Sequence, residues 1–406
     1  MLKKLRQFDW FVFALLICLV VCGVIAIYSA STTKIGDEFQ TEDFYKKQII
    51  WIIISLAAFV VLMKVPYSVI DFLIIPLYVI SILLLIAVFF MPQVKGAHRW
   101  LLFGPISFQV SEMAKLITIL LIAKLISKPY ISEWQILIRS FIILILPAIL
   151  VLFEPDLGTA LTFGVILFAI LASSHLPKFY LLLIISPFLS IITSFSAVLF
   201  FVYLLLLLYL LFRNKLSYVA IGFTGVINSF IFFVTPIFWN NLKDYQQNRI
   251  LSFIDPMRDP FGTGYQIIQS KIAIGSGGFF GKGFLSGTQK NLHFLPEHHT
   301  DFIFSVIGEE FGFFGCVVLL LFFFLFLMRI AKNMNKLKRK EMYYASVGIL
   351  TCLSFQVVVN IGMNIGIIPT TGIPLPFISY GGSNLLFNVL AVGLILKYLN
   401  ERSIFE

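Results

Sequence analysis

The residues best suited to acid–base chemistry gather around position 300. Two carboxylates and two imidazoles, those of Glu297, His298, His299 and Asp301, immediately precede an apolar run. Burial at such a boundary moves pKa values toward the pH at which an enzyme works, so Asp301 is a candidate acid or base. Asp301 could instead cap the helix that the apolar run predicts. A metal site is a third interpretation, which the spacing disfavours because it matches no zinc pattern such as His-Glu-x-x-His.

Charged residues within the apolar runs also need an explanation. A charged side chain at membrane depth costs roughly 2.5–3.5 kcal/mol on insertion scales, so each one needs a partner or a function. Glu112 and Lys115 are three positions apart and share one face of a predicted helix. They form either a self-neutralising ion pair or a site in which Glu112 holds Lys115 as a cation for a phosphate. Glu309 and Glu310 lie further along the run after Asp301, and at least one of them is expected to face a polar interior.

Two shorter polar segments carry further candidates. Asp156 follows Glu154 and Pro155 between two apolar runs, where it could cap the next helix or bind a cation or a sugar hydroxyl. Trp100 is typical of an anchor at the membrane interface, or it supplies a stacking face for a sugar. Arg99, beside it, offers a guanidinium fork for a pyrophosphate.

The composition excludes a water-soluble fold. Of 406 residues, 59% are hydrophobic and 12% are charged, against roughly 45–50% apolar and 25% charged residues in a soluble domain. Apolar runs long enough to cross a hydrocarbon core of roughly 30 Å as helices recur along the chain. A break near Pro187 and Ser190 is predicted to divide 178–212 into two helices. About twelve spans are therefore predicted, at residues 10–30, 48–63, 69–91, 109–127, 136–153, 157–174, 178–195, 197–212, 216–237, 301–328, 342–366 and 382–398.

The basic residues predict how the chain is oriented. With the N-terminus inside, the inner segments hold most of them, including Lys3, Lys4 and Arg6 and the cluster between Arg329 and Lys340. This asymmetry satisfies the positive-inside rule and places both termini in the cytoplasm. The formal charge of +10 is then a topology signal, and nucleic-acid binding is not expected, because the basic residues sit at span ends. The first run is predicted to be a retained span, since its about 20 residues exceed the apolar core of a usual signal peptide.

One large polar interruption separates two groups of spans. Residues 238–300 are rich in Asp, Gly, Gln and His, and the predicted topology makes them a large extracytoplasmic loop. Its glycine-rich part, 275–283, is either a flexible connector or a backbone that wraps a ligand or inserts part-way into the bilayer. Shorter outer loops at 93–108, 153–156 and 367–379 face the same side. With no soluble domain evident, residues 1–406 are predicted to form one integral membrane domain whose outer loops converge on one site.

Several of these stretches together resemble the SEDS family (shape, elongation, division and sporulation), the polytopic peptidoglycan glycosyltransferases. Residues 259–265 and 281–289 are more similar to its rod-shape members than to its division members. Family members have about ten spans, so the resemblance implies a core of ten helices plus an extra pair near 178–212. The stretches cover almost the whole chain in the family's order, and they are residues 96–100, 111–115, 154–159, 295–310 and 364–384.

The resemblance implies polymerisation of lipid II at the outer face of the cytoplasmic membrane during cell elongation and rod-shape maintenance. It assigns the general base to Asp301. Charge that develops on the leaving undecaprenyl pyrophosphate would be met by Lys115, by Arg99 or by a divalent cation such as Mg²⁺ or Mn²⁺. The positions implied to bind substrate are Arg99, Trp100, Glu112, Lys115, Asp156, Lys282, Glu297 and His299.

The implied partners are a class B penicillin-binding protein, which is a transpeptidase whose single span packs against the bundle, other elongation-complex proteins and membrane lipid. A flippase for the same lipid-linked sugar is the main alternative, because ionisable residues inside a bundle and proline-broken segments also mark substrate pathways. The polar residues here concentrate near the outer surface, whereas a flippase needs them throughout the membrane depth. A non-enzymatic scaffold of the wall-synthesis complex is the remaining alternative.

Overall fold

In the computed structural model of this chain most residues are helical. The structure describes residues 8–35, 38–92, 98–103, 106–214, 216–242, 247, 251–253, 255–260, 262, 264–288 and 299–401. Within these ranges twelve apolar helices match the twelve predicted spans, which confirms the all-α polytopic fold. They are α2 (Trp10–Ala30), α3 (Phe44–Lys64), α4 (Tyr67–Val88), α5 (Val110–Ile126), α6 (Glu133–Phe153), α7 (Leu157–Ser173), α8 (Phe179–Thr193), α9 (Ala197–Arg213), α10 (Tyr218–Asn241), α14 (Ile303–Met334), α15 (Lys340–Asn364) and α16 (Gly382–Glu401). Eight of them are long and apolar enough to cross a membrane, judged by length and composition.

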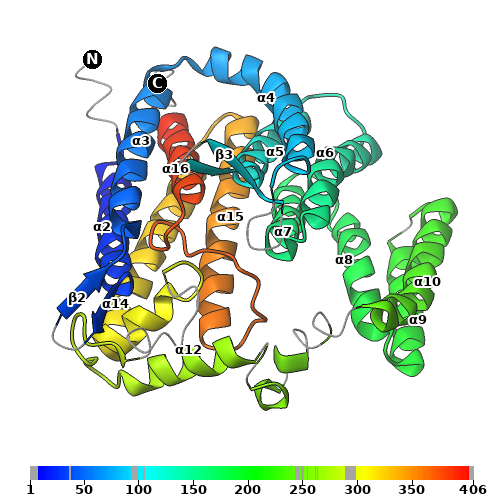
Figure 1. The fold of residues 1–406 in the computed structure, drawn as a ribbon. Helices are drawn as coiled ribbons and strands as arrows, with labels where there is room; N and C mark the ends of the chain where they lie inside the picture. The colour runs from blue at the N-terminus through cyan, green and yellow to red at the C-terminus, as the bar shows by residue number, and fades with distance from the viewer. Residues whose placement is uncertain are drawn as a thin grey trace.

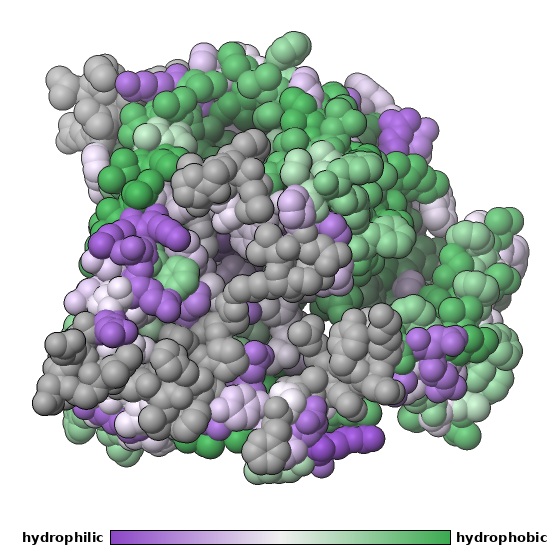
Figure 2. All heavy atoms as spheres, viewed as in Figure 1, coloured by the Kyte–Doolittle hydropathy of each residue, from purple (hydrophilic) through white to green (hydrophobic). Residues whose placement is uncertain are grey.

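The most buried helices form the centre of the bundle. In α15 and α16, 67% and 72% of the apolar window is buried, whereas in α3, α4 and α10 the share is 17% or less. α15 packs against α5, α7 and α14, and α16 packs against α3 (Figure 1). Apolar side chains cover much of the outside of the bundle in Figure 2. Such a surface suits contact with lipid, because the helices satisfy their own backbone hydrogen bonds.

The two ends of the bundle differ. The start of α2 and the end of α16 lie at one end, here called the terminal end (Figure 1). The short helices η1 (Pro256–Arg258) and α12 (Tyr265–Ser276) lie at the other, here called the loop end, and α12 packs against α14 and α15.

Two antiparallel hairpins, which the sequence did not predict, follow α2 and precede α5. In the first, β1 (Thr32–Ile35) pairs with β2 (Glu38–Thr41). In the second, β3 (Trp100–Phe103) pairs with β4 (Ile106–Gln109). The pairing gives these connecting segments hydrogen-bond partners for their own backbone groups.

The region 178–212 contains two helices, α8 and α9, close to the predicted spans 178–195 and 197–212, although the break is not at Pro187 or Ser190. Pro187 is inside α8, which continues to Thr193, and the break falls at residues 194–196. A proline has no N–H to bond the carbonyl four residues earlier, which is that of Leu183. This carbonyl accepts instead from Ser186 Oγ at 3.1 Å. The neighbouring hydroxyl therefore allows the helix to continue past the proline.

The helices α8, α9 and α10 form a group beside the bundle (Figure 1). They pack mainly against one another and reach the bundle through contact of α8 with α7. The buried side chain of Asn228 on α10 joins the three helices. Its Oδ1 accepts from Ser190 Oγ at 2.5 Å and from Tyr203 OH at 3.2 Å, and its Nδ2 donates to Ser186 Oγ at 3.2 Å. Hydrogen bonds of this kind hold helices together where lipid provides no hydrophobic driving force.

Candidate functional site

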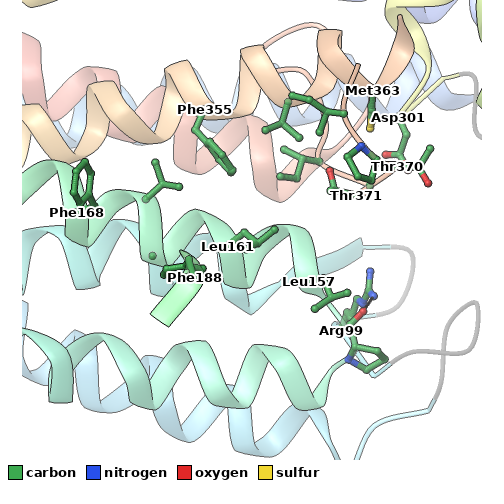
Figure 3. A pocket seen from close by; sticks show the side chains of 18 of the residues that line it. Arg99, Leu157, Leu161, Phe168, Phe188, Asp301, Phe355, Met363, Thr370 and Thr371 are labelled. Atoms are coloured by element: carbon green, nitrogen blue, oxygen red, sulfur yellow. Dashed lines mark hydrogen bonds between the residues drawn. The ribbon is translucent and has the colours of Figure 1, made fainter. Parts of the chain in front are cut away.

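A cavity of about 790 Å³ lies between α7, α8 and α15, and residues 368–373 border it. Its length is lined by apolar side chains, among them Leu161, Phe168 and Phe188. Figure 3 shows Asp301 and Arg99 together at one end of this cavity, with the phenylalanines extending away from them. The cavity therefore joins a polar end to an apolar channel.

Asp301 directly precedes α14, and two amides of α15 hold its backbone. Nδ2 of Asn360 and Nδ2 of Asn364 each donate to the Asp301 carbonyl oxygen at 3.0 Å. The N-cap position of α14 belongs to Phe302, so Asp301 stands one residue before the position from which a side chain caps the helix. The carboxylate lines the cavity instead.

Residues 369–373 pass beside the Asp301 carboxylate. A Cβ atom added to Gly372, whose φ is +72°, would lie 3.5 Å from Asp301 Oδ2. The same segment rests on the start of α7, where a Cβ added to Gly158 would lie 2.7 Å from the Thr371 carbonyl oxygen. Only glycine allows so close an approach of helix and segment. The start of α7 thus supports the wall that faces Asp301.

Sequence reasoning did not single out Asn360 and Asn364. A signal was present, because Gln356, Asn360 and Asn364 are amides spaced four positions apart, and they share one face of a mostly apolar helix. Buried polar groups in a span need partners, so such a set predicts that another segment docks on that face.

Arg99 is fixed to the turn between α6 and α7. Its Nε donates to the Glu154 carbonyl oxygen at 3.0 Å, and its Nη2 donates to the Pro155 carbonyl oxygen. Its Nη1 lies 4.0 Å from Asp156 Oδ2. Asp156 itself caps α7, since Oδ1 accepts from the Thr159 N–H at 3.1 Å and Oδ2 from Thr159 Oγ1 at 2.9 Å. The capping interpretation of Asp156 is therefore observed, together with its proximity to Arg99.

Trp100 opens β3, and its cross-strand partner is Gln109. Gln109 also reaches the turn beside Arg99, because its Nε2 donates to Asp156 Oδ2 at 3.4 Å. The second hairpin is thereby joined to the start of α7, which brings Arg99, Trp100 and Asp156 into one neighbourhood.

Glu112 and Lys115 form the ion pair that their spacing predicts. Lys115 Nζ lies 2.8 Å from Glu112 Oε1, and both side chains are buried. Asn384 Nδ2 donates to the second carboxylate oxygen at 3.2 Å. The pair lines a separate small cavity and is absent from the lining of the cavity at Asp301. A phosphate-binding role for Lys115 remains a prediction.

The remaining residues that were predicted to bind substrate are Lys282, His299 and Glu297. Lys282 Nζ binds Glu309 Oε1 at 2.7 Å. His299 stacks on Phe44 with ring centroids 4.1 Å apart. Neither Lys282 nor His299 is among the residues that line the large cavity. Glu297 lies outside the described residues.

Glu154 is a buried acid between α6 and α7. Its side chain is 1% exposed, and within the described part of the chain its Oε1 has no hydrogen-bond partner. Burial, together with the charge of Asp156, raises the pKa of Glu154 to about 8 against the opposing charge of Arg99. Glu154 is therefore mostly protonated at neutral pH.

In the described ranges, no three His, Cys, Asp or Glu side chains gather as ligands for an ion. These residues do not supply a ligand set for Mg²⁺ or Mn²⁺ at Asp301, and a divalent cation stays a prediction.

Comparison with known proteins identifies the family. The family model of the FtsW, RodA and SpoVE cell cycle proteins matches residues 9–205 and 194–404. The chain belongs to this family. It is the SEDS family that the sequence motifs resemble, so this prediction is confirmed. The peptidoglycan glycosyltransferase MrdB of Escherichia coli K12 is 36% identical over 398 residues, which cover 96% of this chain and 92% of MrdB.

Solved structures show the same SEDS fold. A structure of a peptidoglycan synthase complex, described as coordinating polymerization and crosslinking, matches with a TM-score of 0.72 at 31% identity and covers 97% of this chain and 98% of that one. The crystal structure of the rod shape determining protein RodA of Thermus thermophilus matches with a TM-score of 0.64 at 25% identity and covers 97% of each chain. The matches span the whole bundle and the site.

Replacing Glu154 with glutamine is expected to flatten the pH dependence of stability. A carboxyl whose pKa rises from 4.5 to about 8 on folding makes the folded state less stable as the pH rises through that window, because the unfolded chain releases its proton first. The effect is at most on the order of 5 kcal/mol. Thermal unfolding in one detergent, followed from about pH 5 to 8, should decline more steeply for the native chain than for Glu154→Gln. Parallel declines would show that Glu154 is ionised in the folded chain.

Proposed function

We propose that this chain is a peptidoglycan glycosyltransferase that polymerises lipid II at the outer face of the cytoplasmic membrane during cell elongation. The observation that carries the proposal is the position of Asp301 at the polar end of a long apolar cavity. Lipid II joins an isoprenoid tail to sugars through a pyrophosphate, so its site needs a lipid-like wall beside polar reacting groups. Membership of a family with relatives named peptidoglycan glycosyltransferases supports the same chemistry.

In the proposed reaction Asp301 is the general base. The 4-hydroxyl oxygen of the acceptor sugar bonds to the anomeric carbon of the donor while the bond from that carbon to the pyrophosphate oxygen breaks. Asp301 takes the hydroxyl proton, and undecaprenyl pyrophosphate leaves with the bonding electrons. A positioned base of this kind contributes roughly 10²–10⁴-fold to the rate.

Arg99 is the cation placed to meet the leaving pyrophosphate. Two of its nitrogens are held by the carbonyl groups of Glu154 and Pro155, which fixes the guanidinium at the polar end of the cavity. A cation fixed in advance stabilises charge as it develops, without reorganising at the moment of reaction. Lys115 is the weaker candidate, because it lies outside this cavity and is paired with Glu112.

In the proposed topology the terminal end faces the cytoplasm and the cavity's polar end faces outward. Basic residues at the terminal ends of α14 and α16, such as Arg329, Lys332 and Lys397, follow the positive-inside rule. The proposed partner is a class B penicillin-binding protein within the elongation complex, because the similar solved complex couples polymerization with crosslinking.

A flippase for lipid II needs a polar path through the membrane for the sugars. The lining of the cavity away from Asp301 and Arg99 is apolar, with Phe168, Phe188 and Phe355 along it. Such a wall suits an isoprenoid tail and disfavours passage of the sugars.

Asp301→Asn is expected to abolish polymerisation, lowering the rate by about 10²–10⁴-fold, because an amide cannot take the hydroxyl proton. The assay supplies lipid II to the purified chain with its transpeptidase partner and separates the glycan strands by length. Thermal unfolding checks that the variant is folded. Absence of polymer from the native complex would refute the enzyme proposal, whereas polymerisation by the folded variant at the native rate would refute only the assignment of the base and favour a different one.

Gly158→Ala is expected to slow polymerisation by about tenfold or more, because the new Cβ would push residues 371–373 away from α7 and toward Asp301. The matched control is Gly222→Ala on α10, where no atom lies within 4 Å of the added Cβ. Rates are compared in the same lipid II assay. Equal rates in both variants would show that contact with the start of α7 does not position the wall.

Asn214→Cys, at the end of α9, is expected to react with a membrane-impermeant maleimide only after the cells are permeabilised. The reason is that the α9–α10 turn lies on the proposed cytoplasmic side. Met257→Cys, exposed in η1, is the control that should react in intact cells. Labelling of Asn214→Cys in intact cells would overturn the topology.

A further inference from the structure

A glycine-rich segment between α12 and α14 lies along a break in α14. The break is at Gly312, where φ is 66° and ψ is −162°. Four backbone hydrogen bonds of 2.8–3.0 Å join residues 278–283 to residues 309–314. They run from the N–H groups of Phe313 and Phe314 to the carbonyls of Gly278 and Phe279, and from the N–H groups of Lys282 and Gly283 to the carbonyls of Glu309 and Glu310. In Figure 1 the chain leaves α12 at the loop end and meets α14 there.

The two backbones touch directly. A Cβ added to Gly281 would lie 2.0 Å from the Glu310 carbonyl oxygen, and one added to Gly312 would lie 2.3 Å from the Gly281 nitrogen. A broken helix in contact with lipid leaves N–H and C=O groups without partners, at a cost of several kcal/mol each. The segment supplies those partners, so it belongs to the membrane-embedded structure.

Two polar side-chain contacts, here called ties, join the chain at α2 to α14. They indicate where this segment lies relative to the bilayer. At the terminal end, Arg329 Nε binds Oδ2 of Asp9, just before α2, at 3.0 Å. At the loop end, Ser29 Oγ donates to the Glu310 carboxylate at 2.6–2.7 Å. The ties are 20 positions apart along α2 and 19 along α14. About 20 helical residues cross a hydrocarbon core of roughly 30 Å, so the ties lie near its two boundaries.

The aromatic tip of the segment reaches past Glu310 toward the terminal end. The Phe279 carbonyl oxygen accepts from the N–H of Phe314, which lies four positions beyond Glu310 and on the far side of the break at Gly312. Phe279 and Phe280 are 74% and 86% exposed. Their surface continues into Phe313 and Phe314, which are also exposed on α14.

The residues after the tip return to the boundary. Lys282 Nζ binds the Glu309 carboxylate at 2.7 Å, and the N–H and Oγ1 of Thr288 donate to it at 2.8 and 2.7 Å. Beside Phe280, an apolar groove of about 410 Å³ opens between α2 and α14. The segment thus has an apolar tip, a polar base and an apolar groove next to the tip.

We propose that residues 277–284 are a membrane anchor, in which Phe279 and Phe280 insert among the phospholipid acyl chains of the leaflet at the loop end. Interfacial segments enter the bilayer with their apolar face by roughly 5–10 Å, and the contact with Phe314 places the aromatic tip on the bilayer side of Glu310. The groove beside Phe280 gives an acyl chain room against α2 and α14. Because the segment is joined to α14 at Glu309 and Glu310, the anchor fixes the depth at which the start of that helix, and Asp301 before it, meets the lipid headgroups.

Photocrosslinking tests the anchor. In the full chain in phospholipid nanodiscs, p-benzoylphenylalanine replaces Phe279 or Phe280, which keeps the aromatic shape. Phe324, exposed on α14 within the span, is the lipid-facing control position. Met257, exposed in η1, is the control position outside the bilayer. After irradiation, mass spectrometry measures the yield of phospholipid adducts.

Adduct yields at 279 and 280 are expected to lie within about twofold of that at 324 and at least about tenfold above that at 257. A yield at both positions no higher than at 257 would overturn the anchor. The same irradiation in native membranes distinguishes lipid from protein. Crosslinks from 280 predominantly to another protein would also overturn the proposal, because they would make this face a protein interface.

Discussion

The site depends on hydrogen bonds between side-chain amides of α15 and backbone carbonyls of two distant segments. Nδ2 of Asn360 donates to Asp301 at 3.0 Å and to the Ile373 carbonyl oxygen at 2.8 Å, so one amide joins the start of α14 to the wall beside the carboxylate. Asn364 adds a bond to Asp301 and accepts from the Ser305 N–H at 3.2 Å. Within a lipid-embedded bundle an unpaired carbonyl costs more than the bond itself contributes. The central helix α15 therefore determines where Asp301 lies.

The cost of burying unpaired polar groups also explains the charge balance at the cavity's polar end. Carbonyl oxygens hold Arg99, and the nearby Glu154 is kept mostly neutral by burial, with its pKa raised to about 8. Among the described residues, the carboxylate that pairs with Arg99 is that of Asp156, whose Oδ2 lies 4.0 Å from Nη1. A guanidinium that is fixed but only partly neutralised keeps its field for a phosphate. In the proposed function, the apolar cavity and its polar end are two parts of one site for a substrate that is half lipid and half sugar.

Hydropathy and local spacing predicted the helices, the Glu112–Lys115 pair and the cap at Asp156, because each depends on neighbours within one helix or turn. They could not predict that Asn364 binds Asp301, since 63 positions separate the two. They divided 178–212 close to the observed position but attributed the break to Pro187 and Ser190, because a local rule cannot show that Ser186 bonds the carbonyl that the proline leaves free. The role of Gly158 required the position of a segment more than 200 positions away. Contacts between distant segments account for what the sequence did not reveal.

The most direct test of this account is a cryo-EM structure of the chain in lipid nanodiscs with lipid II bound. The account predicts isoprenoid density along the cavity between α7, α8 and α15, with the pyrophosphate beside Arg99 and a sugar within hydrogen-bonding reach of Asp301. Lipid II bound elsewhere, with only phospholipid in this cavity, would contradict it.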